Sequence, residues 1–246
     1  MKSAVKSAMT LLRARNLSKS FGGVHAVQNV DFDLGQGEIR ALIGPNGAGK
    51  TTFVSLLSGR ITATAGSVEF RGQDITGLPI HKRVRKGIAY TFQITSIFPN
   101  LTVLENAAIA AQNRCQPEAI SADIRHDADL ALQQVGIAHL KDEPAGTIAY
   151  GHQRLLEVAM GLALNPVLLI FDEPTQGLSD AEIQDFCALV KQINQSTTVL
   201  LIEHNMSVVM SLAHRITVFD RGRVLAQGSP DQIRDNAAVQ AAYLGS

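Results

Sequence analysis

The sequence predicts an α/β fold with a mostly parallel sheet and helices on its faces, and three observations support this class. Aliphatic runs of strand length alternate with helical stretches toward the C-terminus, as at 167–171 and 198–202. A glycine-rich motif at 44–52 joins a predicted strand to a predicted helix. The region from about 100 to 165 is rich in Ala, Leu, Gln and Glu, which predicts a helical insertion.

The stretches on either side of the glycine-rich motif read as short strands. Residues 9–43 contain strand-like pieces that are separated by turns at 21–23 and 35–37. Residues 66–92 continue in this style. In the helical insertion, one stretch with helical spacing is expected to contain Leu130, Leu132, Val135 and Ile137.

The C-terminal part is expected to alternate helices and strands. Helices are predicted to begin at Ser179 and at about Met206, and a strand is predicted at 217–219. Ser229 and Pro230 suit the N-cap and the first position of a final helix. A separate basic cluster reads as the solvated face of a helix, and its members are Lys82, Arg83, Arg85 and Lys86.

The motif at 44–52 predicts a phosphate-binding loop, because it fits the pattern G-x-x-x-x-G-K-[ST]. Backbone N–H groups of such a loop surround phosphates, the Lys50 ammonium would reach the β- and γ-phosphates, and the Thr51 hydroxyl would face Mg²⁺. The phosphates would also lie at a helix N-terminus, which carries roughly half a positive charge. The predicted binding residues are Gly44, Pro45, Asn46, Gly47, Ala48, Gly49, Lys50, Thr51 and Thr52.

Two further strand ends carry groups that suit chemistry on a phosphate. The apolar run 167–171 ends in Asp172 and Glu173, at the strand end where ligands bind in open α/β sheets. Asp172 suits a Mg²⁺ site, and Glu173 suits the polarisation of an attacking water. His204 follows the run 198–202 and is a candidate sensor of the γ-phosphate.

Composition excludes several function classes. The 22 Lys and Arg balance the 22 Asp and Glu, so no net positive field attracts nucleic acid. Cys115 and Cys187 are the only cysteines, which excludes a disulfide framework and fits a reducing cytoplasm. No apolar run approaches the roughly 20 residues of a membrane span, and the N-terminus does not read as a signal peptide.

Together these motifs resemble the ATP-binding-cassette (ABC) ATPase family. The loop at 44–52, Gln93, residues 150–153, the pair 172–173 and His204 follow the order of motifs in that family. The resemblance extends from about residue 10 to residue 244 and includes the family's signature motif at 150–153.

The resemblance implies an architecture as well as a ligand. It implies a P-loop NTPase (RecA-like) core with an antiparallel β-subdomain at about 9–92 and 166–246, and an α-helical subdomain at about 93–165. It also implies that ATP is bound with Mg²⁺ between two ATPase subunits, so that the signature of one subunit closes on the loop of the other.

The same resemblance implies roles for further residues. Phe21 would stack on adenine, an interaction worth roughly 1–3 kcal/mol. Gln93 would contact Mg²⁺ and the attacking water. The signature residues that would complete the partner's ATP site are Ala149, Tyr150, Gly151 and Gln153. Residues 177–180 would form the loop that crosses the dimer interface.

The signature departs from the general family pattern at one position. Ala149 stands where a serine would donate to the γ-phosphate, and losing a charge-assisted hydrogen bond costs about 1.5–3 kcal/mol if nothing replaces it. The Gly151 N–H and the helix dipole remain. Hydrolysis opposite this signature is therefore expected to be slower, and a poorly hydrolysing nucleotide-binding partner stays open as an alternative.

A finer resemblance is to the ATPase subunits of branched-chain amino acid importers. It rests on the stretches 91–93, 149–157, 202–206 and 242–245. It implies integral-membrane permease partners, a homo- or heterodimer of ATPase subunits, an indirect link to an extracytoplasmic binding protein, and a place on the cytoplasmic face of the membrane. ATPases of lipopolysaccharide exporters and of urea or short-amide importers remain alternatives.

Two other classes of this fold fit less well, and one segment is a candidate permease contact. DNA-repair ATPases usually insert a coiled coil or zinc modules, and translation-associated proteins normally carry two cassettes, whereas this chain shows one cassette without such insertions. Residues 94–105, with Ile97, Phe98 and Leu101, match the region that lines the permease groove in the family. Packing of the helical insertion explains their apolar character equally well.

Overall fold

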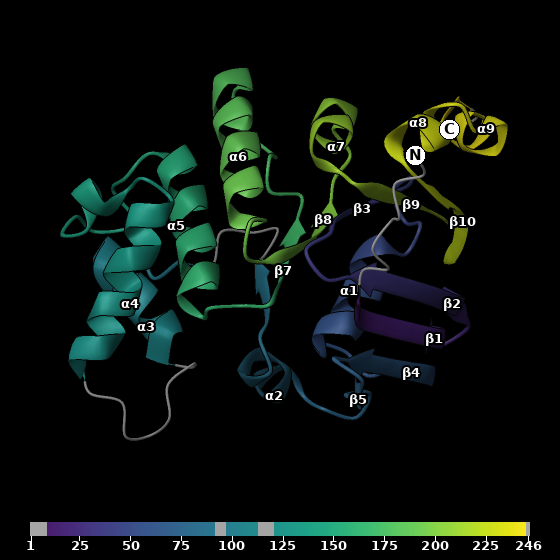
Figure 1. Cartoon of the computed structure of the whole chain (residues 1–246), viewed down its shortest axis with the longest axis horizontal. Coiled ribbons are helices and arrows are strands. Elements are labelled where there is room, and N and C mark those ends of the chain that lie inside the picture. Colours follow the sequence, from purple (N-terminus) through teal and green to yellow (C-terminus); the bar gives the residue numbers. More distant parts are fainter. Residues whose placement is uncertain (1–8, 92–96, 113–120, 245–246) are drawn as a thin grey trace, which may run out of the picture.

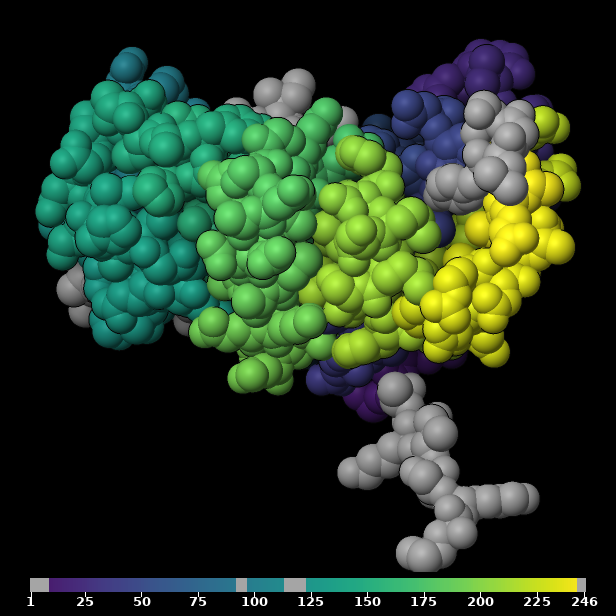
Figure 2. Space-filling model, turned by 90° about the horizontal axis from the view of Figure 1, so that it is seen from above, coloured from purple at the N-terminus to yellow at the C-terminus, as the bar shows by residue number. Residues whose placement is uncertain are grey.

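A computed structural model describes residues 9–91, 97–112 and 121–244. Figure 1 shows the helices α3, α4 and α5 gathered at one end of the molecule, with the strands β1, β2 and β4 toward the other end. The space-filling view in Figure 2 shows the same order along the long axis, from the teal helices through α6 and α7 to the yellow C-terminal elements. This arrangement confirms the predicted mixed α/β class.

The larger sheet has six strands in the order β10-β9-β3-β8-β7-β6. Its β3, β8, β7 and β6 pair in parallel with their neighbours, β9 is parallel to β3, and β10 is antiparallel to β9. The strands span Ile39–Ile43 (β3), Ile88–Thr91 (β6), Leu168–Asp172 (β7), Thr198–Ile202 (β8), Arg215–Asp220 (β9) and Arg223–Gly228 (β10). Since β3, β8 and β7 are neighbours, their carboxyl ends meet at one edge of the sheet.

The smaller sheet is antiparallel, with the order β2-β1-β4-β5. Its strands span Thr10–Phe21 (β1), Val24–Gly35 (β2), Ala65–Phe70 (β4) and Gln73–Asp74 (β5). The predicted turns at 21–23 and 35–37 follow β1 and β2. The expectation of short pieces is wrong for these two strands, because β1 and β2 have 12 residues each, but it holds for β3, which has five. Register shifts interrupt the pairing of β1 with β2. Such irregularities break the regular alternation of apolar and polar residues from which a long strand is predicted.

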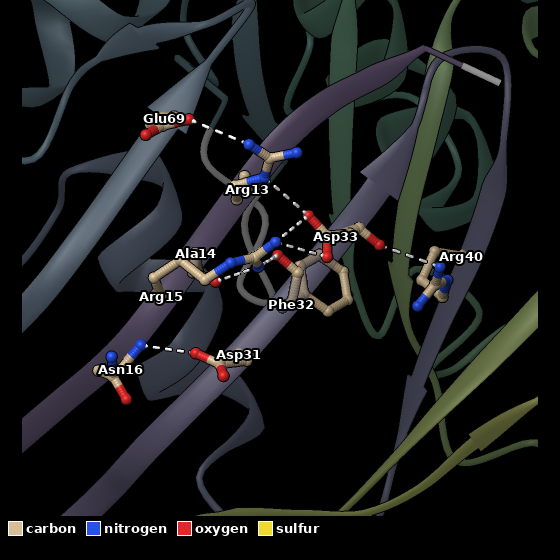
Figure 3. Close-up of polar contacts among 9 residues, drawn as sticks. All are labelled: Arg13, Ala14, Arg15, Asn16, Asp31, Phe32, Asp33, Arg40 and Glu69. Carbon is tan, nitrogen blue, oxygen red and sulfur yellow. Dashed lines mark hydrogen bonds and ion pairs between the residues drawn. The ribbon is translucent and has the colours of Figure 1, made fainter. Parts of the chain in front are cut away.

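Polar contacts tie the outer face of this sheet together (Figure 3). The Asp33 carboxylate on β2 accepts from Arg13 Nε at 3.1 Å and from Arg15 Nη2 at 2.8 Å, both on β1. Arg13 also lies 3.7 Å from the Glu69 carboxylate on β4. Burial opposes ionisation of Asp33, but its hydrogen bonds to Arg15 and Arg13 prevail and lower its pKa. These side chains are partly exposed, so each pair contributes at most about 1 kcal/mol.

The helix α1, Lys50–Ser58, packs between the two sheets through Phe53. The Phe53 ring lies 5.3 Å from the Phe32 ring of β2 and 5.0 Å from the Phe219 ring of β9. All three side chains are buried, and aromatic pairs at this spacing add about 0.5–1.5 kcal/mol beyond their area. This cluster fixes the helix that follows the glycine-rich loop.

Arg83 corrects the prediction for the basic cluster. It lies on α2, Ile80–Arg85, and its guanidinium is buried instead of solvated. It donates to the carbonyls of Leu56 and Leu57, at the C-terminus of α1, each at 2.8 Å, and to those of Thr76 and Leu78. Burial lowers the pKa of Arg83 to about 10, so it stays charged at neutral pH, where a cation suits the helix C-terminus.

The helices of the insertion span Val103–Gln112 (α3), Ser121–Gln134 (α4) and Tyr150–Ala163 (α5). Leu132, Val135 and Ile137 are buried as expected, but Leu130 is 47% exposed. Residues two apart lie on different sides of a helix, so Leu130 does not share the face of Leu132. Val135 and Ile137 follow the end of α4 instead of belonging to it. The subdomain boundaries at 93 and 165 stay predictions.

The C-terminal helices begin close to their predicted positions. They span Asp180–Ile193 (α6), Met206–Leu212 (α7), Pro230–Arg234 (α8) and Ala237–Leu244 (α9). Ser179 and Ser229 cap α6 and α8 in capping boxes, and Pro230 occupies the first turn of α8. Within the described residues, no helix combines the length and apolar character that a bilayer crossing requires.

Candidate nucleotide-binding site

The glycine-rich loop at 44–52 connects β3 to α1, as predicted, and its glycines fill positions that disfavour other residues. Gly44, Gly47 and Gly49 have φ values of 150°, 76° and 99°. A Cβ on Gly44 would lie 2.2 Å from the Phe219 carbonyl oxygen, and one on Gly49 would lie 2.3 Å from the Ala26 carbonyl oxygen. The loop is therefore held against β9 and β2 and opens at the N-terminus of α1.

Lys50 is the first residue of α1, and its ammonium bonds back to the loop. Nζ donates to the Gly44 carbonyl at 2.7 Å and to the Pro45 carbonyl at 3.0 Å. Desolvation lowers the Lys50 pKa, against the opposing charges of Glu173 and Asp172. The side chain of Thr51 is exposed and that of Thr52 is half-buried. If a phosphate binds at this helix N-terminus, Lys50 would exchange its two neutral carbonyl partners for an anion.

Asp172 ends β7 and is almost fully buried, with its two oxygens in different situations. Oδ2 accepts a hydrogen bond from the Tyr90 hydroxyl at 2.5 Å, whereas Oδ1 is buried with no hydrogen-bond partner in the described part of the chain. Desolvation raises the Asp172 pKa, although the Tyr90 hydrogen bond opposes this shift. Burial also raises the Tyr90 pKa, with Asp172 acting in the same direction.

The donor set around Asp172 fits Mg²⁺ bound together with a nucleotide. No group of three or more His, Cys, Asp or Glu side chains suited to a metal occurs among the residues that the structure describes. Mg²⁺ characteristically takes one or two protein oxygens and completes its shell with substrate phosphates and water. The unpartnered Oδ1 of Asp172 and the exposed hydroxyl of Thr51 supply oxygens of this kind.

Glu173 and His204 meet beyond the ends of the neighbouring strands β7 and β8. His204 Nδ1 lies 4.0 Å from Glu173 Oε1, with the imidazole largely exposed and the carboxylate mostly buried. The Glu173 N–H donates to the Ile202 carbonyl at 2.9 Å. Glu173 has φ = 50°, an unfavourable value for a residue with a side chain, and such strain clusters at functional sites.

The signature residues open α5 and pack against the loop that precedes α6. Ala149 is the N-cap without a side-chain hydrogen bond, and the Gln153 side chain donates to the Ile148 carbonyl at 3.1 Å. The Tyr150 hydroxyl donates to the Gln176 carbonyl at 3.3 Å, and a Cβ on Gly151 would lie 2.2 Å from Glu182 Oε1. Thus 149–153 contacts the loop of Gln176 and the first turn of α6 in its own chain.

The structure brings some predicted residues together and separates others. The loop at 44–52, Asp172, Glu173 and His204 share one edge of the larger sheet, whereas no hydrogen bond between described residues joins 149–153 to this loop. Phe21 ends β1 with its ring half exposed and the Lys19 ammonium 5.0 Å from the ring centroid, so it is not a core residue. Gln93 lies outside the described residues.

Sequence reasoning missed Tyr90 and Glu203, which contact this edge. Tyr90 lies on β6, next to β7 in the sheet, and Glu203 is a fully buried carboxylate directly after β8. The apolar runs that predict β7 and β8 say nothing about which strand lies beside them. An acidic residue between an apolar strand and His204 was the only available signal.

Comparisons with known proteins agree with this geometry. A family described as "ABC transporter" matches residues 27–176, and one described as "Branched-chain amino acid ATP-binding cassette transporter" matches residues 223–246. The chain is 38% identical to the high-affinity branched-chain amino acid transport ATP-binding protein BraF of Pseudomonas aeruginosa, and equally to LivG of Escherichia coli K12. Each alignment covers 96% of this chain and 98% of the relative.

A second group of relatives is somewhat less similar. The lipopolysaccharide export system ATP-binding protein LptB of Escherichia coli K12 is 34% identical, over the same shares of both chains. Among solved structures, the ADP conformation of an ATP-binding cassette of an ABC transporter superposes with a TM-score of 0.88 at 28% identity, covering 97% of this chain and all of that one. The chain therefore belongs to the ABC transporter family, as an ATP-binding cassette that binds nucleotide and hydrolyses ATP.

Proposed function

We propose that this chain is the ATPase subunit of an importer of branched-chain or other hydrophobic amino acids. The observation that carries the substrate class is the 38% identity to BraF and LivG over 96% of the chain, against 34% to LptB. The match of residues 223–246 to the branched-chain family supports the same choice. Lipopolysaccharide export is the second candidate, because LptB is covered over the same share.

In the proposed reaction, Lys50 and the loop at 44–52 bind the phosphates of ATP. Lys50 leaves the Gly44 and Pro45 carbonyls for the β- and γ-phosphates, and Phe21 stacks its exposed face on adenine. Asp172, Thr51 and Gln93 would hold Mg²⁺, which would supply charge neutralisation at the phosphates when bound. The carboxylate of Glu173 accepts a proton from the attacking water, and His204 contacts the γ-phosphate.

The site is proposed to be completed by a second ATPase subunit. Ala149, Tyr150, Gly151 and Gln153 lie at the N-terminus of α5, where a helix dipole favours an anion, yet they form no hydrogen bond with the loop at 44–52 within the described chain. A head-to-tail dimer would place this helix end on the partner's γ-phosphate. Because Ala149 has no hydroxyl, the backbone N–H groups and the dipole would carry this contact alone.

A groove beside the larger sheet is the proposed permease contact. It has a volume of about 350 Å³ and lies between α2, α3 and α5, lined by apolar residues that include Ile80, Val84, Ile109 and Met160. Ile80 is partly exposed there. Among the predicted contact residues, Phe98 is 49% exposed and 94–96 lie outside the described residues. A permease helix in this groove would hold the subunit on the cytoplasmic face of the membrane.

Reconstitution tests the proposed substrate. The chain is co-expressed with the permease subunits of a branched-chain amino acid importer, placed in proteoliposomes with that importer's binding protein, and supplied with radiolabelled leucine. We expect ATP-dependent leucine uptake that the Glu173→Gln variant abolishes, with urea and short amides as comparison substrates. ATP hydrolysis without leucine uptake, or copurification with lipopolysaccharide-export components, would reject the importer assignment.

A further inference from the structure

Glu203 is a fully buried carboxylate whose two oxygens are both occupied by donors. Oε1 accepts from the Thr175 hydroxyl at 2.5 Å and from the Thr175 N–H at 3.2 Å. Oε2 accepts from the N–H groups of His204 at 2.9 Å and Asn205 at 3.1 Å. No ion pair with a described Lys, Arg or His accompanies these bonds, so neutral groups alone hold the carboxylate.

These four hydrogen bonds connect the two loops that carry the proposed reactive side chains. Thr175 lies two residues after Glu173, and His204 and Asn205 lie in the loop after β8. The Glu173 N–H also bonds to the Ile202 carbonyl, which adds a backbone link at the same junction. Glu203 therefore fixes the backbone on both sides of the 4.0 Å separation between Glu173 and His204.

The connection continues to the signature end of α5. Gln176 follows Thr175, and its carbonyl accepts the Tyr150 hydroxyl. Tyr150 in turn accepts from Arg154 Nε at 3.1 Å. Hydrogen bonds of Glu203 and Tyr150, joined by the peptide bond between Thr175 and Gln176, thus link the loop of His204 to the residue next to Gly151.

We propose that Glu203 is a positioning residue for hydrolysis, which sets the placement of Glu173 relative to His204 by clamping the loop of Thr175 to the loop of Asn205. This rests on the roles proposed above for Glu173 and His204. A carboxylate is required because all four partners are donors, and an ionised carboxylate accepts at every lone pair. An amide would turn one N–H₂ group toward existing N–H or O–H donors.

The experiment compares matched variants in the full-length ATPase, with turnover at saturating ATP and Mg²⁺, ATP Kd and Tm as readouts. We expect Glu203→Gln to lower kcat by about tenfold or more while ATP Kd changes by less than about twofold, because a small misplacement near the reacting groups costs rate more than binding. Thr175→Val should lower kcat in the same direction, and Thr175→Ser, which keeps the hydroxyl, should restore it.

Glu38→Gln is the matched control. Glu38 is a mostly buried carboxylate that accepts from Arg40 Nε at 2.6 Å and from the Gly35 N–H at 2.9 Å, at the end of β3 away from the site. This variant should lower Tm and leave kcat unchanged. Because both variants replace a mostly or fully buried carboxylate with an amide, comparing them separates a general loss of stability from a misplacement of Glu173 relative to His204.

A kcat of Glu203→Gln within twofold of wild type, with a lower Tm, would overturn the proposal. If Glu203→Gln does not fold, an unchanged kcat in Thr175→Val would overturn it. Turnover retained in Glu173→Gln would instead refute the role of Glu173, so the two failures are distinguishable. In the double variant of Glu203→Gln and Thr175→Val, the two losses should not add, because both remove the same clamp.

Discussion

The Tyr90 hydroxyl donates to Oδ2 of Asp172 at 2.5 Å, while Oδ1 of the same carboxylate is buried without a partner among the described residues. One oxygen is thus fixed by the neighbouring strand, and the other is left for a ligand. An unpaired buried oxygen costs free energy in the empty protein, and a metal bound with the nucleotide would recover that cost. This division of one carboxylate between a structural and a ligand-binding role leads to the first two predictions.

Tyr90→Phe should raise the Mg²⁺ concentration that ATP hydrolysis requires. The substitution removes the donor to Oδ2, so Asp172 can turn away from the phosphate loop, and the lost charge-assisted bond corresponds to about 1.5–3 kcal/mol. The Mg²⁺ concentration for half-maximal ATPase should rise by about tenfold, while ATP binding without metal stays near the wild-type value. The check is a Mg²⁺ titration of turnover together with metal-free ATP binding. An unchanged Mg²⁺ half-saturation would contradict the positioning of Asp172 by Tyr90.

Asp172→Asn should stabilise the nucleotide-free protein at pH 8. Desolvation raises the folded-state pKa of Asp172, so the folded protein holds this proton more tightly than the unfolded chain does. As the pH rises from the ordinary pKa of the unfolded state to the raised pKa of the folded state, the free energy of unfolding therefore falls. Above this window, the ionised Asp172 carboxylate destabilises the folded protein. The asparagine variant avoids this cost and should melt a few degrees higher at pH 8.

The same stabilisation should shrink as the pH is lowered through the window, because Asp172 of the wild type then takes up its proton. Thermal melts of both proteins between pH 4 and pH 8 test this, with hydrolysis as the control that shows loss of function. A variant that melts at or below the wild-type temperature at pH 8 would argue against a costly buried carboxylate.

Arg83→Leu should destabilise the fold without changing the nucleotide site directly. Four carbonyls, two of them at the end of α1, would lose their donor, at a cost of about 2–4 kcal/mol. Arg85→Leu, on the exposed side of α2, is the matched control and should change stability by less than about 0.5 kcal/mol. Urea denaturation gives both changes in the free energy of unfolding. Equal changes in the two variants would show that the carbonyl contacts of Arg83 do not stabilise the fold.

Ala149→Ser should raise both stability and turnover. Ala149 is the N-cap of α5 without a side-chain hydrogen bond, and a serine at such a position typically adds about 0.5–2 kcal/mol. The same hydroxyl would offer the proposed partner site a donor for the γ-phosphate. Tm and steady-state ATPase are the readouts. A rise in Tm with unchanged turnover would show that the hydroxyl caps the helix but does not reach a phosphate.

The sequence predicts best those features that are encoded locally. The loop at 44–52 has a fixed spacing of glycines, and β8 is found at its predicted bounds because a short aliphatic run is buried on both faces. The positions of Asp172, Glu173 and His204 followed from these runs. The strand order β3-β8-β7-β6 could not be predicted from the sequence. This order places the hydroxyl of Tyr90 on the carboxylate of Asp172.

Arg83 was misinterpreted and Glu203 was missed for the same reason. Arg83 stands in a run of basic residues that looks solvated, and only the packing of α2 against the end of α1 gives it carbonyl partners. Glu203 follows an apolar strand in the sequence, and nothing near it indicates its partner Thr175, which lies in the neighbouring loop. The role of a buried polar group depends on partners that are distant in the sequence, whereas the apolar periodicity of a strand or helix is set by residues that are close in the sequence.

Turnover and ATP affinity of Glu173→Gln, measured together, test the proposed catalytic edge of the sheet. The amide keeps the size of the side chain but cannot take a proton from water, so kcat should fall by about 100-fold or more while ATP Kd stays within about twofold of wild type. Lys50→Ala is the counterpart that should lose ATP affinity, since it removes the ammonium beside the phosphates. Wild-type turnover in Glu173→Gln would contradict the assignment of this edge as the site of hydrolysis.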